Sequence, residues 1–198
     1  MKLKTFIFIG RSGCGKGTQV KLLKEYLQKN DSGRDIYHME TGDRFRSFIK
    51  GDSYSSKHTA EIVLAGKRVD SFVAIWLWSG GFIENMKGNE HIIIDGSPRT
   101  FGEAQILDTV MDFYERQNPT IIYIDVARDW AIARLTERGR ADDSDPKKMA
   151  EKQDYFESDV MPAVEYYKKN PRYTVLQIAG EKSIEEVSKE IFQKIFNV

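Results

Sequence analysis

The sequence has a single cysteine and no excess of charge of either sign. One cysteine cannot form a disulfide within the chain, which fits a reducing compartment. The 30 lysines and arginines balance 30 aspartates and glutamates, so the formal net charge is zero. Proteins dedicated to nucleic acids or to membrane surfaces carry a basic excess. The balance therefore argues against both kinds of partner.

Long apolar runs are also missing. No stretch approaches the roughly 20 apolar residues that cross a membrane, and the N-terminus lacks the apolar core and cleavage site of a signal peptide. We therefore expect a cytoplasmic protein. We also expect the chain to work as a monomer. A chain of 198 residues can bury one sizeable hydrophobic core, so a single domain over residues 1–198 is predicted.

Short apolar segments alternate with longer segments of helical pattern. The apolar residues of the short segments run continuously, which is typical of parallel strands covered on both faces. The pattern predicts an α/β fold with strands at 5–9, 36–39, 91–95, 120–125 and 173–178 and helices at 17–29, 71–87, 101–116, 128–138 and 183–196.

Two regions interrupt this alternation. Residues 41–70 are polar with a helical pattern, and residues 136–148 are charged and contain the helix-breaking Pro146. We expect both to be insertions over the edge of the sheet where ligands bind.

The predicted helix 71–87 is rich in aromatic residues. Phe72 and Trp76 lie one helical turn apart in an apolar stretch, and Trp78 follows. Aromatic side chains at this spacing indicate packing in the core rather than stacking on a nucleotide base.

Residues 10–19, GRSGCGKGTQ, connect the first predicted strand to the first predicted helix. Gly10, Gly15 and Lys16 fit G-x-x-x-x-G-K, the phosphate loop, in which bare backbone N–H groups bind phosphate oxygens and the lysine reaches the β and γ phosphates. A strand, a glycine loop and a helix N-terminus together form an anion site. Cys14 is either a reactive thiol, because a helix start and a lysine lower a thiol pKa, or a small residue that fills the loop.

This loop resembles that of adenylate kinases and related nucleoside monophosphate kinases, G-x-x-G-x-G-K-G-T, in which a glycine precedes the threonine as Gly17 precedes Thr18. Four further segments resemble family motifs in the family's order, namely TGDRFR (41–46), AGKRV (65–69), DGSPRT (95–100) and RLTERGRADD (134–143). The resemblance implies a three-layer phosphate-loop kinase fold with a five-stranded parallel sheet in the order 2-3-1-4-5. It also implies that 41–70 binds the monophosphate and that 136–148 is a very short lid.

The resemblance assigns roles to individual residues. Arg46 and Arg99 would grip the acceptor monophosphate, since a guanidinium binds phosphate oxygens through two parallel hydrogen bonds. By the same resemblance, the catalytic residues are Lys16, Arg99, Arg138, Arg140 and Lys152; the ATP site comprises Gly13, Cys14, Gly15, Lys16, Gly17, Thr18 and Arg134; and the monophosphate site comprises Thr41, Arg46, Val69, Gly96, Arg99 and Glu103.

The resemblance also implies a magnesium ion. Asp95 would be its partner through water, with Thr18 near the same ion, while Asp95 would equally serve to cap the Gly-Ser-Pro turn that follows it. Asp142 and Asp143 would orient the lid arginines.

Three positions depart from the family pattern. Ser97 stands where family members carry an aromatic residue. Lys152 stands at the position of a lid arginine, counting back from Met161, which keeps the charge but loses the planar fork. Glu103 stands where adenylate kinases use a glutamine to recognise adenine, so the identity of the acceptor base depends on it.

These features predict a Mg²⁺-dependent kinase that transfers the γ-phosphate of ATP to AMP, giving two ADP. Thr41 favours AMP, because pyrimidine monophosphate kinases of the family commonly carry alanine there. The alternatives are the same reaction on GMP, CMP or UMP, and a regulatory protein that binds nucleotide without transferring phosphate.

Overall fold

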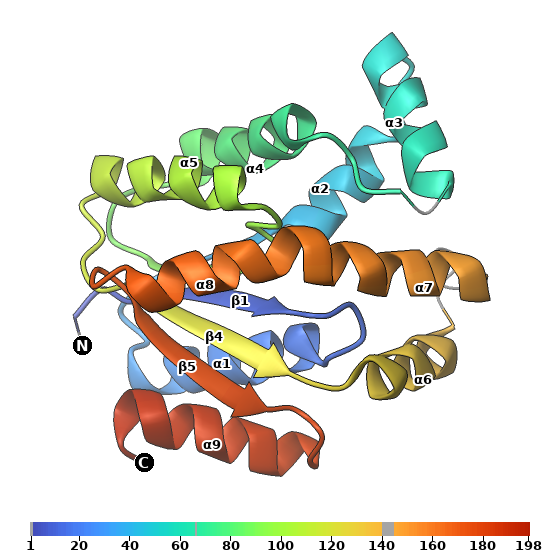
Figure 1. Cartoon of the computed structure of the whole chain (residues 1–198). Coiled ribbons are helices and arrows are strands. Elements are labelled where there is room, and N and C mark those ends of the chain that lie inside the picture. Colours follow the sequence, from blue (N-terminus) through green and yellow to red (C-terminus); the bar gives the residue numbers. More distant parts are fainter. Residues whose placement is uncertain (1, 66, 140–144) are drawn as a thin grey trace.

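The computed structural model describes residues 2–65, 67–139 and 145–198. Its centre is a five-stranded parallel sheet in the order β2-β3-β1-β4-β5 (Figure 1). Both the strand order and the five predicted strands are confirmed, with ends that differ by one residue at most. The strands are β1 (Thr5–Gly10), β2 (Ile36–Glu40), β3 (His91–Asp95), β4 (Thr120–Asp125) and β5 (Thr174–Ala179).

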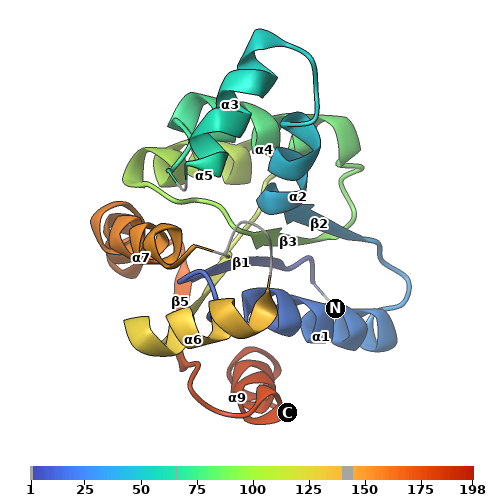
Figure 2. The same cartoon turned by 90° about the vertical axis from the view of Figure 1, so that its right-hand side faces the viewer.

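Helices cover both faces of this sheet. Figure 1 shows α4, α5 and α8 above the sheet and α1 and α9 below it, and Figure 2 shows α2 and α3 rising away from the strands. The helices are α1 (Lys16–Asn30), α2 (Thr41–Phe48), α3 (Tyr54–Leu64), α4 (Ser71–Asn85), α5 (Phe101–Phe113), α6 (Arg128–Arg138), α7 (Pro146–Tyr155), the π-helical turn η2 (Phe156–Val160), α8 (Met161–Lys169) and α9 (Ile184–Phe196). The five predicted helices are confirmed, with ends shifted by up to three residues.

The central strand β1 explains why the apolar segments are continuous. Ile7 and Ile9 pack into the core under α4, α5 and α8. Phe6 and Phe8 alternate with them and pack against α1 and α9. Since successive side chains of a strand point to opposite faces, a strand covered on both faces needs apolar residues at every position.

Helix α4 corrects part of the prediction for its aromatic residues. Trp78 is 1% exposed and packs in the core, as expected. Phe72 is 74% exposed and Trp76 is 60% exposed, so the prediction of core packing was wrong for these two. The helical spacing identifies residues that share a face, but here that face points to solvent, while Val73 and Leu77 point inward.

Helices make up much of the described part of the two predicted insertions. Residues 41–70 contain α2 and α3. Pro146 does not break a helix but begins α7, where its missing N–H costs nothing because the first turn has no intrahelical partner for it. The carboxylate of Asp145 caps this helix by accepting a hydrogen bond from the Lys147 N–H at 2.8 Å.

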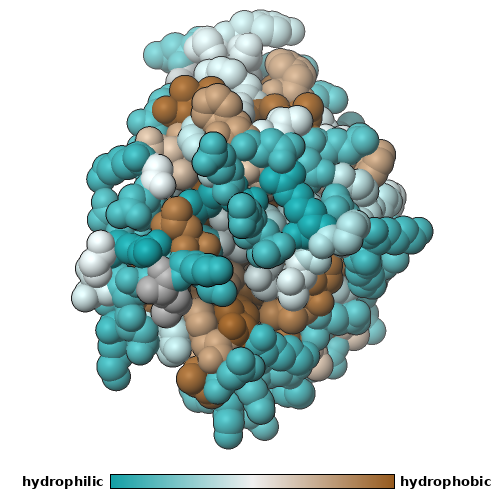
Figure 3. Space-filling model, turned by 90° about the vertical axis from the view of Figure 1, so that its left-hand side faces the viewer, coloured by the Kyte–Doolittle hydropathy of each residue, from teal (hydrophilic) through white to brown (hydrophobic). Residues whose placement is uncertain are grey.

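The face at the amino ends of the strands shows small groups of apolar side chains between hydrophilic ones (Figure 3). Small scattered groups of this kind are usual on protein surfaces. Within the part of the chain that the structure describes, none of the helices combines the length and the apolarity needed to span a bilayer.

The two tryptophans of α4 test this packing. We expect Trp78→Ala to lower the free energy of unfolding by about 3–5 kcal/mol, because it leaves a cavity in the core. The rings of Trp76 and Phe48 pack edge to face with 5.3 Å between their centres. Trp76→Ala should therefore lower the free energy of unfolding by only about 1 kcal/mol. Urea denaturation of both variants measures the difference, and equal losses would contradict the assignment of faces.

Candidate active site

A cavity of about 930 Å³ opens at the carboxyl ends of β1, β2 and β3. This is the edge at which open parallel sheets bind their ligands. The cavity is lined by twelve of the residues predicted from the sequence: Gly13, Gly15, Lys16, Gly17, Thr18, Arg46, Asp95, Gly96, Arg99, Arg134, Arg138 and Lys152. The structure therefore brings together segments that lie up to 139 positions apart in the sequence.

The phosphate loop turns sharply between β1 and α1. Gly13 and Gly15 have φ angles of 93° and 92°, a region that side chains other than glycine disfavour. A Cβ atom on Gly13 would lie 2.5 Å from the carbonyl oxygen of Ala131 in α6. No side chain caps α1 and no acidic residue lies in its first turn, so its N-terminal N–H groups and the positive end of its dipole face the cavity.

Gly17 has a different reason to be glycine. Its φ is not in the left-handed region, and a Cβ atom there would meet no protein atom within 4 Å. Nothing in the described protein therefore requires a bare backbone at this position. A ligand that approaches the α1 backbone closely would require one.

The ammonium of Lys16 lies over the loop. Its Nζ donates hydrogen bonds to the carbonyl oxygens of Gly10 at 2.7 Å and Arg11 at 2.9 Å. These bonds hold a positive charge at the start of α1, where the helix dipole has the same sign. The combined field favours an anion in the cavity.

Two arginines outside the loop also line the cavity. The guanidinium of Arg46 in α2 binds the carboxylates of Asp43 and Glu40, the latter at 3.0 Å. Arg99 donates from its Nε to the carbonyl oxygen of Gly96 at 2.8 Å, which fixes the side chain at the start of the turn after β3. Both arginines line the cavity, where the charge of Arg46 is compensated by the carboxylates of Asp43 and Glu40.

Glu40 lines the same cavity and was not predicted from the sequence. It ends β2 and pairs in register with Asp95, which ends β3. Burial, followed by the negative charge of Asp43, raises the pKa of its carboxyl. Its position at a strand end directly before TGDRFR was the signal available in the sequence.

Four predicted residues do not line this cavity. Cys14, Thr41, Val69 and Glu103 are all buried. The hydroxyl groups of Thr41 and Ser97 hydrogen-bond to each other at 2.9 Å, so the serine that replaces the family's aromatic residue holds the threonine in place. The roles of these four residues in binding remain predictions.

Glu103 is 1% exposed and lies behind Arg99. Its Oε2 accepts a hydrogen bond from the Arg99 backbone N–H at 3.1 Å. Burial raises the pKa of this carboxyl, although the Arg99 N–H and the charges of Arg99 and Arg68 act in the opposite direction. A carboxyl in this environment is more easily protonated than an exposed one.

The lid region is only partly described. Arg138 ends α6, and both Arg138 and Lys152 of α7 line the cavity. Arg134 pairs with Glu137 at 3.0 Å and lies over the ring of Trp130. Arg140, Asp142 and Asp143 lie outside the described residues.

The oxygen atoms expected near magnesium fit that role. The Asp95 carboxylate and the Thr18 hydroxyl both line the cavity, and no other described side chain hydrogen-bonds to them. Mg²⁺ prefers one or two such oxygens together with water and substrate phosphates. Among the residues that the structure describes, no group of three or more histidine, cysteine or acidic side chains is placed to hold a metal.

Comparisons with known proteins agree with this site. The sequence model of the family described as adenylate kinase matches residues 8–172. The chain belongs to the adenylate kinase family. It is 28% identical over 196 residues to an adenylate kinase of Flavobacterium psychrophilum, covering 97% of this chain and 98% of that protein. It is also 30% identical to adenylate kinase 1 of a Nostoc species, covering 93% and 95% of the two chains, and 30% identical to an adenylate kinase of Corynebacterium urealyticum, covering 92% and 94%.

Membership makes the chain an adenylate kinase-like phosphotransferase. The matched region contains the phosphate loop from Gly10 onward, both acceptor arginines and the described part of the lid.

Gly17 provides a direct test of the phosphate loop. We expect Gly17→Ala to weaken ATP binding about 10- to 100-fold, the scale of one lost hydrogen bond to a charged group. Alanine is a better helix former than glycine, so the free energy of unfolding should stay the same or rise by up to about 1 kcal/mol. Calorimetric titration with ATP and thermal unfolding measure the two effects separately.

Gly102 offers a matched control, because it is also the second residue of a helix and a Cβ atom there meets nothing within 4 Å. Gly102→Ala should bind ATP as the unmodified protein does. Unchanged ATP affinity in Gly17→Ala would mean that no phosphate approaches this backbone.

Proposed function

We propose that the chain catalyses the reversible transfer of the γ-phosphoryl group of Mg²⁺-bound ATP to AMP, giving two molecules of ADP. The observation that carries the proposal is that one cavity joins the phosphate loop of α1 to Arg46 and Arg99. A protein that only bound ATP would need the loop alone. The two arginines outside the loop, Arg46 and Arg99, support a second phosphate-bearing ligand.

The proposed reaction is a direct displacement. A phosphate oxygen of AMP attacks the γ-phosphorus, the bond from that phosphorus to the β–γ bridging oxygen breaks, and ADP leaves with the electron pair. No general base is needed, because a phosphate monoester with a second pKa of about 6 is already ionised at neutral pH. The protein contributes alignment and compensation of negative charge.

The residues divide this task between them. The N–H groups of α1 and the ammonium of Lys16 hold the donor phosphates, and Arg46 and Arg99 hold the acceptor phosphate. Asp95 and Thr18 would hold Mg²⁺ through water, and the ion would neutralise charge on the donor phosphates.

Arg138 and Lys152 line the same cavity as the phosphate loop and the two arginines. They are proposed to stabilise the charge of the group in transfer. A lysine at position 152 supplies charge without the two-pronged geometry of an arginine, so Lys152→Arg should leave activity unchanged or raise it.

The acceptor base is proposed to be adenine. The ionised Glu103 carboxylate only accepts hydrogen bonds, whereas adenine presents an amino donor beside the N1 acceptor. A protonated carboxyl presents one donor and one acceptor, as a glutamine does. Burial raises the pKa of Glu103, which favours the protonated form. The names of the curated relatives support adenine as well. Guanine, with two adjacent donors, is the competitor that an ionised Glu103 would favour.

Lys16→Met tests the donor side of the site. The substitution keeps a similar side-chain length and removes the charge, so we expect a folded protein whose kcat for phosphoryl transfer falls about 100-fold or more. Coupled assay of ADP formation from ATP and AMP gives the rate. Lys29→Met, at the other end of α1, should behave as the unmodified protein. Full activity of Lys16→Met would rule out the phosphate-loop mechanism.

Glu103→Gln tests the acceptor side. At neutral and higher pH we expect the variant to have a kcat/KM for AMP about fivefold above that of the unmodified protein, from about 1 kcal/mol for one net hydrogen bond. Because its pKa is raised, Glu103 in the unmodified protein becomes protonated at a higher pH than an exposed glutamate. The protonated carboxyl then has an O–H that can donate a hydrogen bond. The advantage of the variant should therefore shrink on acidification.

The control is a panel of AMP, GMP, CMP and UMP as acceptors for both proteins. AMP should be the best acceptor for each. Faster phosphorylation of GMP by the unmodified protein, lost in Glu103→Gln, would replace the adenylate proposal with a guanylate kinase reaction. ATP binding without transfer to any of the four would indicate a regulatory protein that binds nucleotide only.

A further inference from the structure

A continuous helical run extends from Pro146 to Lys169 (Figure 1), and several of its residues line the cavity. Its middle is the π-helical turn η2, Phe156–Val160. Such turns contain one residue more than an α-helical turn and are frequent at functional sites. The first and last residues of η2 are buried and line the cavity.

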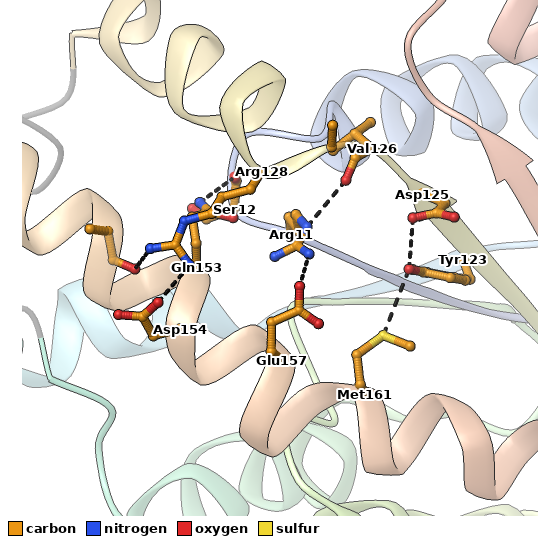
Figure 4. A network of polar contacts seen from close by, with 12 residues as sticks. Arg11, Ser12, Tyr123, Asp125, Val126, Arg128, Gln153, Asp154, Glu157 and Met161 are labelled. Atoms are coloured by element: carbon orange, nitrogen blue, oxygen red, sulfur yellow. Dashed lines mark hydrogen bonds and ion pairs between the residues drawn. The ribbon is translucent and has the colours of Figure 1, made fainter.

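One acidic residue of η2 binds the phosphate loop. The carboxylate of Glu157 pairs with the guanidinium of Arg11, which lies between the glycines of the loop. Arg11 also donates from Nε to the carbonyl oxygen of Val126 at 3.1 Å and lies 4.6 Å from the centre of the Phe156 ring. Figure 4 shows Glu157 reaching from the helix toward Arg11. Because the Arg11 side chain is only 11% exposed, its positive charge needs a nearby negative charge, and Glu157 supplies it.

A second acidic residue of η2 binds the acceptor region. The Asp159 carboxylate pairs with Nε of Arg68 at 2.7 Å. Arg68 belongs to the AGKRV segment that ends the acceptor insertion, and it donates to the Val69 carbonyl oxygen and the Ser71 hydroxyl, both at 3.3 Å. This pair therefore connects η2 to the segment that leads from α3 into α4.

A neighbouring contact places the preceding helix against the same loop. Gln153 is fully buried, and its Nε2 donates to the Ser12 carbonyl oxygen at 3.3 Å (Figure 4). Lys152, directly before it, lines the cavity. The helical run thus touches the donor loop through Gln153 and Glu157 and the acceptor segment through Asp159, and its Lys152 lines the cavity.

We propose that Glu157 and Asp159 are positioning residues that fix the donor loop, the acceptor segment and Lys152 relative to one another. This inference rests on the proposed phosphoryl transfer. Displacement at phosphorus requires attacking and leaving oxygens in line, and an error of about 1 Å in such an alignment costs up to about 100-fold in rate. Neither Glu157 nor Asp159 is among the described residues that line the cavity, so both act through the groups that they hold.

Glu157→Gln and Asp159→Asn test the proposal, since each keeps the shape of the side chain and removes its charge. We expect each variant to lower kcat with ATP and AMP about 5- to 10-fold, and the double variant more, while each KM stays within about twofold. Glu165→Gln is the control. Its carboxylate pairs with Lys168 inside α8 and connects no other element, so its kinetics should be unchanged.

Charge exchange separates positioning from general stability. Asp159→Arg and Arg68→Asp each place like charges together and should lower kcat about 10-fold, while the double exchange restores an ion pair and should recover most of the rate. Unchanged kcat in Glu157→Gln and Asp159→Asn, a change in KM alone, or no recovery in the double exchange would overturn the proposal. An unmodified protein that transfers no phosphate would instead overturn the proposed function.

Discussion

Packing of the phosphate loop against its neighbours is the constraint on which the rest of the site depends. A Cβ atom on Gly10 would lie 2.6 Å from the carbonyl oxygen of Ile124 in β4, and one on Gly13 would lie 2.5 Å from that of Ala131 in α6. The loop therefore has one path between β1 and α1, and this path directs the N–H groups of the helix into the cavity. Because β1 is the central strand, the loop at its end shares one cavity with Arg99 after β3, Arg46 in α2 and Arg138 in α6.

Much of this arrangement could be predicted from the sequence because it depends on local signals. Apolar segments without alternation predicted buried parallel strands, and the glycine spacing predicted an anion site where the first strand ends. The strand order came from the resemblance rather than from periodicity. The same motifs predicted Arg46 and Arg99, which are far apart in sequence and meet at one cavity.

The remaining features depend on contacts that the sequence does not specify locally. Spacing placed Phe72 and Trp76 on one face of α4 but did not show that this face meets solvent. A glutamate such as Glu40 usually lies on the surface, and only the register of β2 with β3 brings this one beside Asp95. The partner of Glu157 lies 146 positions earlier in the chain, so no pattern in either segment predicts the pair.

The central claim is that two nucleotides meet, phosphate to phosphate, in one cavity. Titration calorimetry with two adenosines joined by five phosphates tests this most directly, because such a compound occupies both regions at once. The account predicts one molecule bound per chain, displacement of both ATP and AMP, and an affinity at least about 100-fold above that of ATP alone. Binding no tighter than that of ATP, with AMP still able to bind, would contradict it.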